Sequence, residues 1–464
     1  MEKIKSPYLD LFEDPIVDDS IKRLEYIEYL PRDSANMDRD GRHVFETRDL
    51  DIFLLPHKAF LEVRGKLVKN DNTNYAANNN VALVNNGWSL FHTAELHLND
   101  QQVEQVSLYL PQASTIMNLV SFSDDYNKSS ASNMLWYKDS GDGGTEAREF
   151  NANADTASAD HTTRAELRTA LRNLRRDNYN SGFRMRNLLT AGNKEVCMLL
   201  PLSSVFGLCR DVTSVTRGIK YSLLLDSANS NNYIHRQNGV DAGKFKISHI
   251  SLWMPKVEPN LAYLADLETK LASGMMKKLY FEQMRVYRQQ YGAAELSPSW
   301  RVTTQQSEQL PRHIFVAFQA VGRDNSQEQN NMIFDNANLR QIFVRINSLQ
   351  YPERALMTNF TEASRNYSRA YMMFQEAVNK YQDTDTGSSI SVEEFASLYP
   401  IIHIDISKHA DQLIGSPADI EINWQLGRNF QFGGADASYY VYAVILSDRY
   451  LTVNALNGKM NVIL

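Results

Sequence analysis

The sequence predicts an all-β fold made of two sandwich-like domains, and three observations support this. The chain has 464 residues, more than one compact domain usually contains. Aromatic residues make up 10% of it, which favours strands over helices. Strand-like runs fill both halves, and a helix-like stretch after Pro255 separates them. Many short strands on both sides of one helical segment are typical of paired sandwiches or jelly rolls.

The first segment is acidic, and we expect residues 1–37 to form an arm that packs on a larger body. The first thirty residues carry eight acids and four bases, without an apolar stretch flanked by positive charge. This pattern excludes a signal peptide. Apolar side chains are scattered through the segment: Leu9, Leu11, Phe12, Ile16, Ile21, Leu24 and Ile27.

The first domain is predicted at residues 38–255. Apolar and charged residues alternate along residues 60–68, as in a half-buried strand, and Asn99-Asp100 is a turn signal. A polar stretch at 121–161 predicts a long functional or mobile loop, and residues 164–176 predict a helix. The strand-like runs are residues 43–55, 60–68, 94–98, 183–188, 196–200, 219–225 and 245–254.

A helical connector is predicted at residues 256–299. Pro259 precedes a set of residues at helical spacing, and Gly292 ends a longer helical region. The spaced residues are Leu261, Leu264, Leu267, Leu271 and Met275. The second domain is predicted at 300–464, with one helix near 361–381 between its strands. Those strand-like runs are residues 314–320, 339–346, 400–406, 420–426 and 439–446.

Charge and cysteine content exclude several classes of protein. The net charge of -7 and the pI near 5.9 argue against a protein that coats nucleic acid, because such binding needs an excess of Lys and Arg. Cys197 and Cys209 are too few for a disulfide scaffold or a zinc site. We expect two reduced thiols packed as small hydrophobic groups. The chain lacks a run of about twenty apolar residues, so we expect no membrane span.

Arginines recur at helical spacing in the predicted helix at 164–176. They are Arg164, Arg168, Arg172, Arg175 and Arg176. One interpretation is a basic patch at an inner face or interface, which would meet a packaged genome or an acidic neighbour. The favoured interpretation is a solvent-exposed face beside the apolar stripe of the same helix.

A second candidate site resembles a calcium-binding loop. Asp383, Asp385 and Glu394 agree with an EF-hand pattern, but Gly387 occupies the fifth position, where a ligand belongs. The favoured interpretation is therefore a solvated loop, with Ser391 and Glu394 capping the next helix.

Motifs for catalysis are missing from the sequence. Its ten histidines show no metal-binding spacing, and we find neither a phosphate-binding glycine loop nor a nucleophile elbow. We therefore expect no catalytic residue, no cofactor and no metal.

An ordered series of segments resembles the double jelly-roll major capsid proteins of Maverick/Polinton (adintovirus-type) DNA viruses or transposons. In the first half, residues 60–67, 89–91, 94–100, 180–186, 198–202 and 246–254 carry the resemblance, with Asp100 in place of the usual Gly. In the second half it is carried by residues 310–318, 331–339, Ala370-Tyr371, 399–407 and 439–446. The series runs from about residue 42 to the C-terminus.

The resemblance implies a homotrimer with two jelly rolls side by side in each chain, which forms a pseudo-sixfold capsomer of an icosahedral virion shell. It implies contacts with further trimers and with minor and penton capsid proteins. It implies contact with double-stranded DNA at most indirectly. Synthesis is expected in the host cytoplasm and assembly in the cytoplasm or nucleus. The alternative is a β-rich binding protein or a carbohydrate-active jelly roll, which predicts a concave site with aromatics and paired carboxylates.

Overall fold

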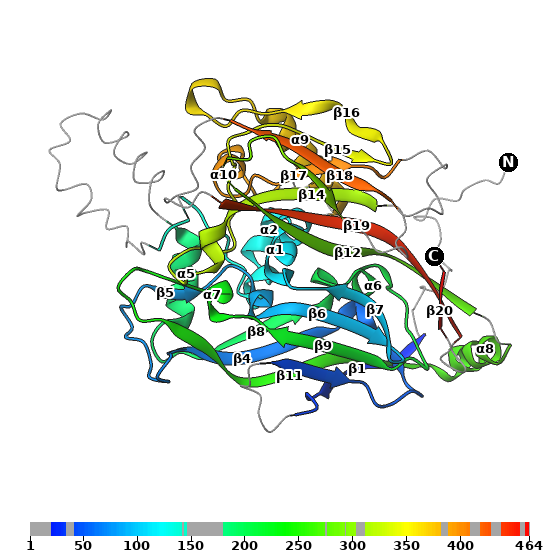
Figure 1. Cartoon of the computed structure of the whole chain (residues 1–464). Helices are drawn as coiled ribbons and strands as arrows, with labels where there is room; N and C mark the ends of the chain where they lie inside the picture. Colours follow the sequence, from blue (N-terminus) through cyan, green and yellow to red (C-terminus); the bar gives the residue numbers. More distant parts are fainter. Residues whose placement is uncertain are drawn as a thin grey trace, which may run out of the picture.

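The structure, a computed structural model, is described over part of the chain. The described residues are 20–33, 41–141, 143–145, 180–273, 276–292, 294–302, 311–381, 388–408, 418–427, 438–454 and 460–463. They form two β-sandwiches, one above the other in Figure 1, and each sandwich consists of two facing antiparallel sheets. The predicted all-β fold of two jelly rolls with helical insertions is confirmed.

The first sandwich contains eight main strands. One sheet has the order β1-β11-β4-β8, with the short β3 paired to β11, and the other has the order β2-β9-β6-β7. The strands of the first sheet are β1 (Ile21–Tyr29), β3 (Phe53–Leu54), β4 (Phe60–Lys69), β8 (Val196–Pro201) and β11 (Gly243–Pro259). Those of the second are β2 (Arg42–Glu46), β6 (Phe91–Leu98), β7 (Gln101–Val106) and β9 (Tyr221–Ser227). A separate ribbon pairs β5 (Val81–Leu83) with β10 (Ile234–Arg236).

The second sandwich repeats this arrangement. Its sheets have the orders β12-β19-β14-β17, with β20 paired to β19, and β13-β18-β15-β16. The first sheet contains β12 (Met276–Gly292), β14 (Pro311–Ala320), β17 (Ile402–Asp405), β19 (Ser438–Asn454) and β20 (Met460–Ile463). The second contains β13 (Ser299–Val302), β15 (Leu339–Ile346), β16 (Leu349–Met357) and β18 (Ile420–Leu426). Counted along the chain, both sandwiches order their main strands one-eight-three-six and two-seven-four-five, which is a jelly roll.

Helices fill the ends of the sandwiches and the space between them. The α-helices are α1 (Leu110–Ser121), α2 (Asp124–Lys128), α5 (Ser181–Thr190), α6 (Gly207–Asp211), α7 (Ser230–Tyr233), α8 (Leu261–Ala272), α9 (Ser368–Tyr381) and α10 (Val392–Ser397). Single 3-10 turns are η2 (Pro56–Lys58), η3 (Gly87–Leu90), η4 (Ser130–Met134), η5 (Leu202–Ser204), η6 (Val321–Asp324) and η7 (Glu362–Ser364). Among the described residues no helix is both long and apolar enough to cross a membrane.

Local sequence explains the strands that were predicted. In β4, Leu61, Val63 and Leu67 are fully buried while Arg64 is exposed, which matches the alternation along this segment, whereas Glu62 on the predicted polar face is buried. The turn predicted at Asn99-Asp100 joins β6 to β7, and both residues have positive φ angles, 48° and 64°. The buried apolar side chains of both sandwiches form one continuous cluster. The two jelly rolls are therefore packed as one body.

The predicted helical connector is wrong beyond residue 272. Helix α8 ends at Ala272, and residues 276–292 form β12, which pairs with β19 along its whole length, from Met276 opposite Asn454 to Gly292 opposite Ser438. The helical spacing that is correct for α8 gives way to alternation at Leu279 and Phe281, which are both buried. The partner strand lies about 160 residues further along the chain, so a local pattern could not reveal the pairing.

Other elements predicted from the sequence differ from the structure or lie outside its described residues. The strand expected at 183–188 is helix α5, whose first turn is capped by the Asn180 side chain accepting a hydrogen bond from the Phe183 N–H. The part of residues 121–161 that is described contains α2, η4 and the buried Trp136, so it is not a polar loop there. The described part of the expected N-terminal arm includes β1, a strand of the first sheet. The predicted helix at 164–176 lies outside the described residues.

Candidate functional site

The two sandwiches meet along a seam, the contact zone formed by β7 and α6 of the first and by β12 and β19 of the second. Helix α6 approaches β12 so closely that a Cβ atom on Gly207 would lie 1.9 Å from the backbone oxygen of Glu282. Only glycine fits at that position. The first turn of α6 is also tied to β7, because the Glu104 carboxylate accepts hydrogen bonds from the N–H groups of Gly207 (2.8 Å) and Leu208 (2.6 Å).

Glu104 is a buried ionisable group of this seam, with only 2% of its surface exposed. Burial raises the pKa of its carboxyl to about 7, although the two backbone N–H groups and the nearby Arg210 and Arg449 act in the opposite direction. Desolvation therefore outweighs the favourable contacts, and Glu104 changes its charge near neutral pH.

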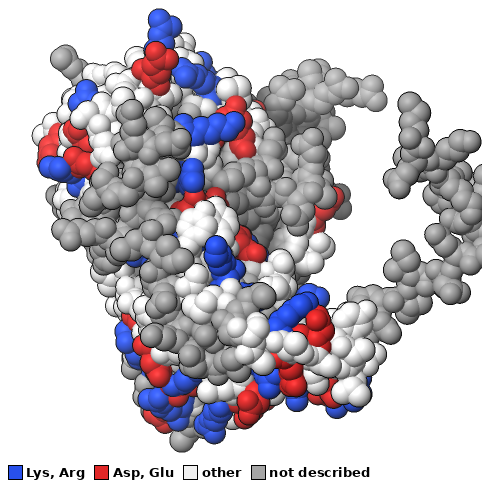
Figure 2. All heavy atoms as spheres, turned by 90° about the vertical axis from the view of Figure 1, so that its right-hand side faces the viewer, with Lys and Arg blue, Asp and Glu red and all other residues white. Residues whose placement is uncertain are grey.

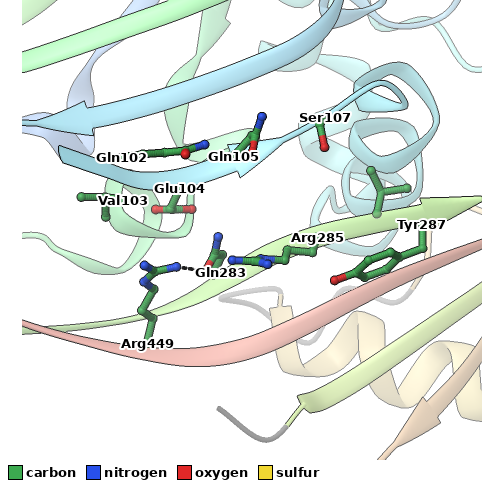
Figure 3. Close-up of a pocket in the computed structure, with 10 residues that line it drawn as sticks. Gln102, Val103, Glu104, Gln105, Ser107, Gln283, Arg285, Tyr287 and Arg449 are labelled. Carbon is green, nitrogen blue, oxygen red and sulfur yellow. Dashed lines mark hydrogen bonds between the residues drawn. The ribbon is translucent and has the colours of Figure 1, made fainter. Parts of the chain in front are cut away.

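A polar cavity of about 310 Å³ lies beside Glu104 (Figure 3). In this cavity Arg449 donates a hydrogen bond to the Gln283 side chain at 2.6 Å. The lining residues come from both sandwiches: Gln102, Val103, Glu104, Gln105 and Ser107 from β7 and its end, Gln283, Arg285, Val286 and Tyr287 from β12, and Arg449 from β19. Glu104 is the only carboxyl group among these residues, so they contain no pair for acid–base catalysis.

A second polar cluster anchors the helical insertion of the first jelly roll. Arg186 on α5 and Asp139 are both fully buried and form an ion pair at 2.6 Å. Arg186 also donates to the backbone oxygens of Leu83 (2.9 Å) and Tyr137. Burial alone would raise the pKa of Asp139, but the Arg186 guanidinium and further hydrogen bonds hold it below the ordinary value. The pair is thus charged and geometrically fixed.

The same insertion is bonded to the second jelly roll. Lys138 forms an ion pair with Glu394 of α10 at 2.6 Å, and the Tyr399 hydroxyl donates to the Asp139 backbone oxygen at 3.3 Å. Between the sandwiches lies α1, in which Leu110 to Val120 are buried (Figure 1). From α1, Gln112 donates a hydrogen bond to Asn331 at 3.1 Å. These contacts fix the two jelly rolls relative to each other.

Most of the site residues that the sequence predicts lie outside the described residues. Arg164, Arg168, Arg172, Arg175 and Arg176 lie outside the described residues, and so do Asp383 and Asp385 of the calcium-like loop. The predicted cap that follows this loop is confirmed, because Ser391 and Glu394 form a reciprocal capping box on α10. On the face shown in Figure 2, positive and negative side chains are interspersed among the described residues.

The cysteines match the expectation in part. Both are free, and Cys209 is buried, which raises the pKa of its thiol well above the ordinary value. Cys197 is exposed, so the prediction of a packed thiol is wrong there: its side chain lies on the outer face of β8, 3.7 Å from Glu62. The part of the chain that is described contains no cluster of three or more His, Cys, Asp or Glu residues that could hold a metal ion.

Two jelly rolls in one chain, repeated strand for strand and joined by a common core, define a double jelly-roll protein. The family model of the double jelly roll-like domain matches residues 170–451, more than half of the chain. The chain therefore belongs to the double jelly roll-like domain family. No curated protein sequence matches it.

Three solved structures with a similar fold come from viruses. A chain of the Sputnik virophage aligns with a TM-score of 0.59 and 11% identity, covering 100% of this chain and 93% of that one. VP54 of the virus PBCV-1, fitted into a reconstruction of Sputnik, gives 0.56 and 10%, with 98% and 99% covered. The mavirus major capsid protein gives 0.51 and 9%, with 100% and 92% covered. At these identities the likeness is one of fold.

The sequence did not point to Glu104, Arg186 or Asp139. The signals in the sequence are an acid shortly after the predicted Asn99-Asp100 turn and an arginine in the segment 183–188, which its pattern predicts to be a strand. Recognising α5 as a helix would have placed Phe183, Arg186 and Thr190 on one buried face.

Proposed function

We propose that this chain is the major capsid protein of an icosahedral DNA virus, and that it is a structural protein and not an enzyme. The observation that carries the proposal is the repetition of the jelly roll within one chain, with both copies fused into one body. Such a body offers two similar lobes. Three copies around one axis then present six lobes, which fill a hexagonal lattice position.

The finer assignment is to the Maverick/Polinton, adintovirus-type group, and it rests on the ordered sequence segments. In this proposal the protein forms homotrimers, the trimers form a shell in the virion, and minor and penton capsid proteins fill the remaining positions. Double-stranded DNA is contacted at most indirectly. The arginines from Arg164 to Arg176 are then candidates for an inner-face or interface patch.

The domain division is part of the proposal. We divide the chain into an arm, a first jelly roll, a connector and a second jelly roll, as predicted at 1–37, 38–255, 256–299 and 300–464. The positions of β1 and β12 support extending each jelly roll by its first strand, so that the arm ends near residue 19 and the connector is α8.

The carbohydrate-active alternative predicts paired carboxylates in a concave site lined by aromatics. In the seam cavity, the lining residues include one carboxyl group, Glu104, and one aromatic side chain, Tyr287. The alternative gains no support from this cavity.

The proposal is tested by sedimentation and electron microscopy of the purified protein. We expect a homotrimer with three-fold symmetry and six lobes, with a contact above about 2,000 Å² between neighbours. Sedimentation as a 53.0 kDa monomer at micromolar concentration would contradict the capsomer.

A further inference from the structure

A second cavity, of about 350 Å³, lies at the edge of the molecule where α8 passes between the jelly rolls. Its apolar walls come from both sandwiches and from α8 itself: Phe53, Val215, Ile219, Leu267, Met276 and Val453. An apolar cavity of about 150 Å³ is enough to bind benzene, so this one has room for a longer apolar group. Its volume also falls within the range of natural ligand sites.

Three cationic side chains line the same cavity, but they differ in their partners. Lys270 is paired with Asp266 at 2.5 Å, and Arg217 lies 3.4 Å from Glu268. Lys277 has its ammonium group 2.7 Å from the backbone oxygen of Val215, and no carboxylate among the described residues pairs with it. Burial lowers the pKa of Lys277, which means that its charge is poorly compensated there.

Helix α8 lies at the edge of the molecule (Figure 1), and its residues Leu267 and Lys270 line this cavity. Leu261 is 77% exposed and Tyr263 is 48% exposed, while Leu267 is half-buried and turned toward the cavity. The helix therefore covers an apolar space without filling it.

We propose that this cavity binds a medium-chain fatty acid, with the acyl chain between α8 and the seam and the carboxylate on Lys277. The apolar walls remove the acyl chain from water, and the carboxylate supplies a negative partner for the ammonium group of Lys277. The site is independent of the proposed function, because it uses only the cavity and its cations.

The test uses the full chain and sodium dodecanoate below its micellar concentration, followed by calorimetry. We expect one saturable site per chain, and an affinity that falls about fourfold for each methylene removed in the series from dodecanoate to octanoate. This series needs no variant, so it stays informative even where a substitution disturbs folding.

The carboxylate contact is tested with Lys277→Met, which keeps the length of the side chain and removes its charge. Dodecanoate should bind at least tenfold more weakly to this variant, whereas the neutral dodecanol should bind it as it binds the parent. Lys278→Met is the matched control, because the neighbouring side chain lies outside the cavity lining, and it should change neither ligand.

Leu267→Trp should fill the cavity and abolish binding of both ligands. The proposal is wrong if this variant binds dodecanoate like the parent, or if Lys277→Met weakens dodecanoate and dodecanol equally. It is also wrong if dodecanoate fails to bind. Binding of a peptide of the acidic residues 1–19 in its place would make the cavity a protein docking site.

Discussion

The first strands of the two jelly rolls, β1 and β12, occupy the same position in the strand order but differ in burial. β1 is at the outer edge of the molecule, where Ile21, Leu24 and Tyr26 are each more than 40% exposed. β12 faces the seam, and its Leu279, Phe281 and Met284 are at most 3% exposed. Figure 1 shows the reason: the sheet of β1 is the lowest layer, whereas the equivalent sheet of β12 is an inner layer.

This difference teaches how the two jelly rolls are stacked. The sheet of β7 faces the sheet of β12, so a second sheet of one sandwich meets a first sheet of the next. The stacking is head-to-tail and not back-to-back. The outward faces of equivalent sheets are therefore free to diverge in polarity, since only one of the two lies against the other sandwich, whereas the inward faces are buried in both.

The largest expected effect is at β12. Phe281→Ala should lower the free energy of unfolding by about 3 to 5 kcal/mol, because a fully buried ring is replaced by a cavity. Leu24→Ala on β1 should lower the free energy of unfolding by less than about 1 kcal/mol, because that side chain is already 42% exposed. Chemical denaturation measures both. Equal losses would mean that β1 is buried by a contact in solution, as β12 is buried at the seam.

An effect of similar size is expected at the fully buried ion pair of the first jelly roll. Arg186→Met should destabilise the protein by about 3 to 5 kcal/mol, because Asp139 remains buried without its partner. The double variant Arg186→Met with Asp139→Leu should recover part of the loss. A single variant that unfolds like the parent would show that the insertion contributes little to the fold.

The pH dependence of the seam follows from Glu104. Its pKa is about 7 in the folded protein and near the ordinary 4.5 in the unfolded chain, so the folded state binds more protons between these values. Its contribution is thus complete below pH 4.5 and is lost as the pH rises through 7. Each pKa unit corresponds to about 1.4 kcal/mol, which gives a loss on the order of 3 kcal/mol.

The measurement compares the parent with Glu104→Gln between pH 5 and pH 8. The parent should lose stability relative to Glu104→Gln as the pH rises. The control is Glu353→Gln, at an exposed carboxyl of β16: it keeps Glu104, so its stability should follow that of the parent at every pH. Parallel curves for the parent and Glu104→Gln would place the titration elsewhere.

The smallest effect is expected at the surface of the second jelly roll. Arg301 and Asp419 form a two-pronged ion pair at 2.6 and 2.7 Å, but their side chains are 74% and 47% exposed. Arg301→Met should leave the free energy of unfolding nearly unchanged, because water and salt screen an exposed pair. If Arg301→Met lowers the free energy of unfolding as much as Arg186→Met does, the expected difference between the buried and the exposed pair does not exist.

The sequence predicted those parts of the fold that depend on neighbouring residues. Alternation in β4, the Asn99-Asp100 turn and the capping box at Ser391 are local, and each was identified. β12 was missed because its pattern follows directly on the real helix α8 and because its partner strand is distant in sequence. The polar groups of the seam were missed for a related reason: Glu104 acquires its properties from α6, about 100 residues away.

The position of β19 has a consequence for synthesis on the ribosome. β19 lies between β12 and β14 and pairs with both, so the inner sheet of the second jelly roll is split until residues 438–454 have emerged. A nascent chain that stops earlier leaves two unpaired apolar edges, which chaperones and proteases bind. The second jelly roll can therefore close only after β19 has been synthesised, because this strand joins β12 to β14.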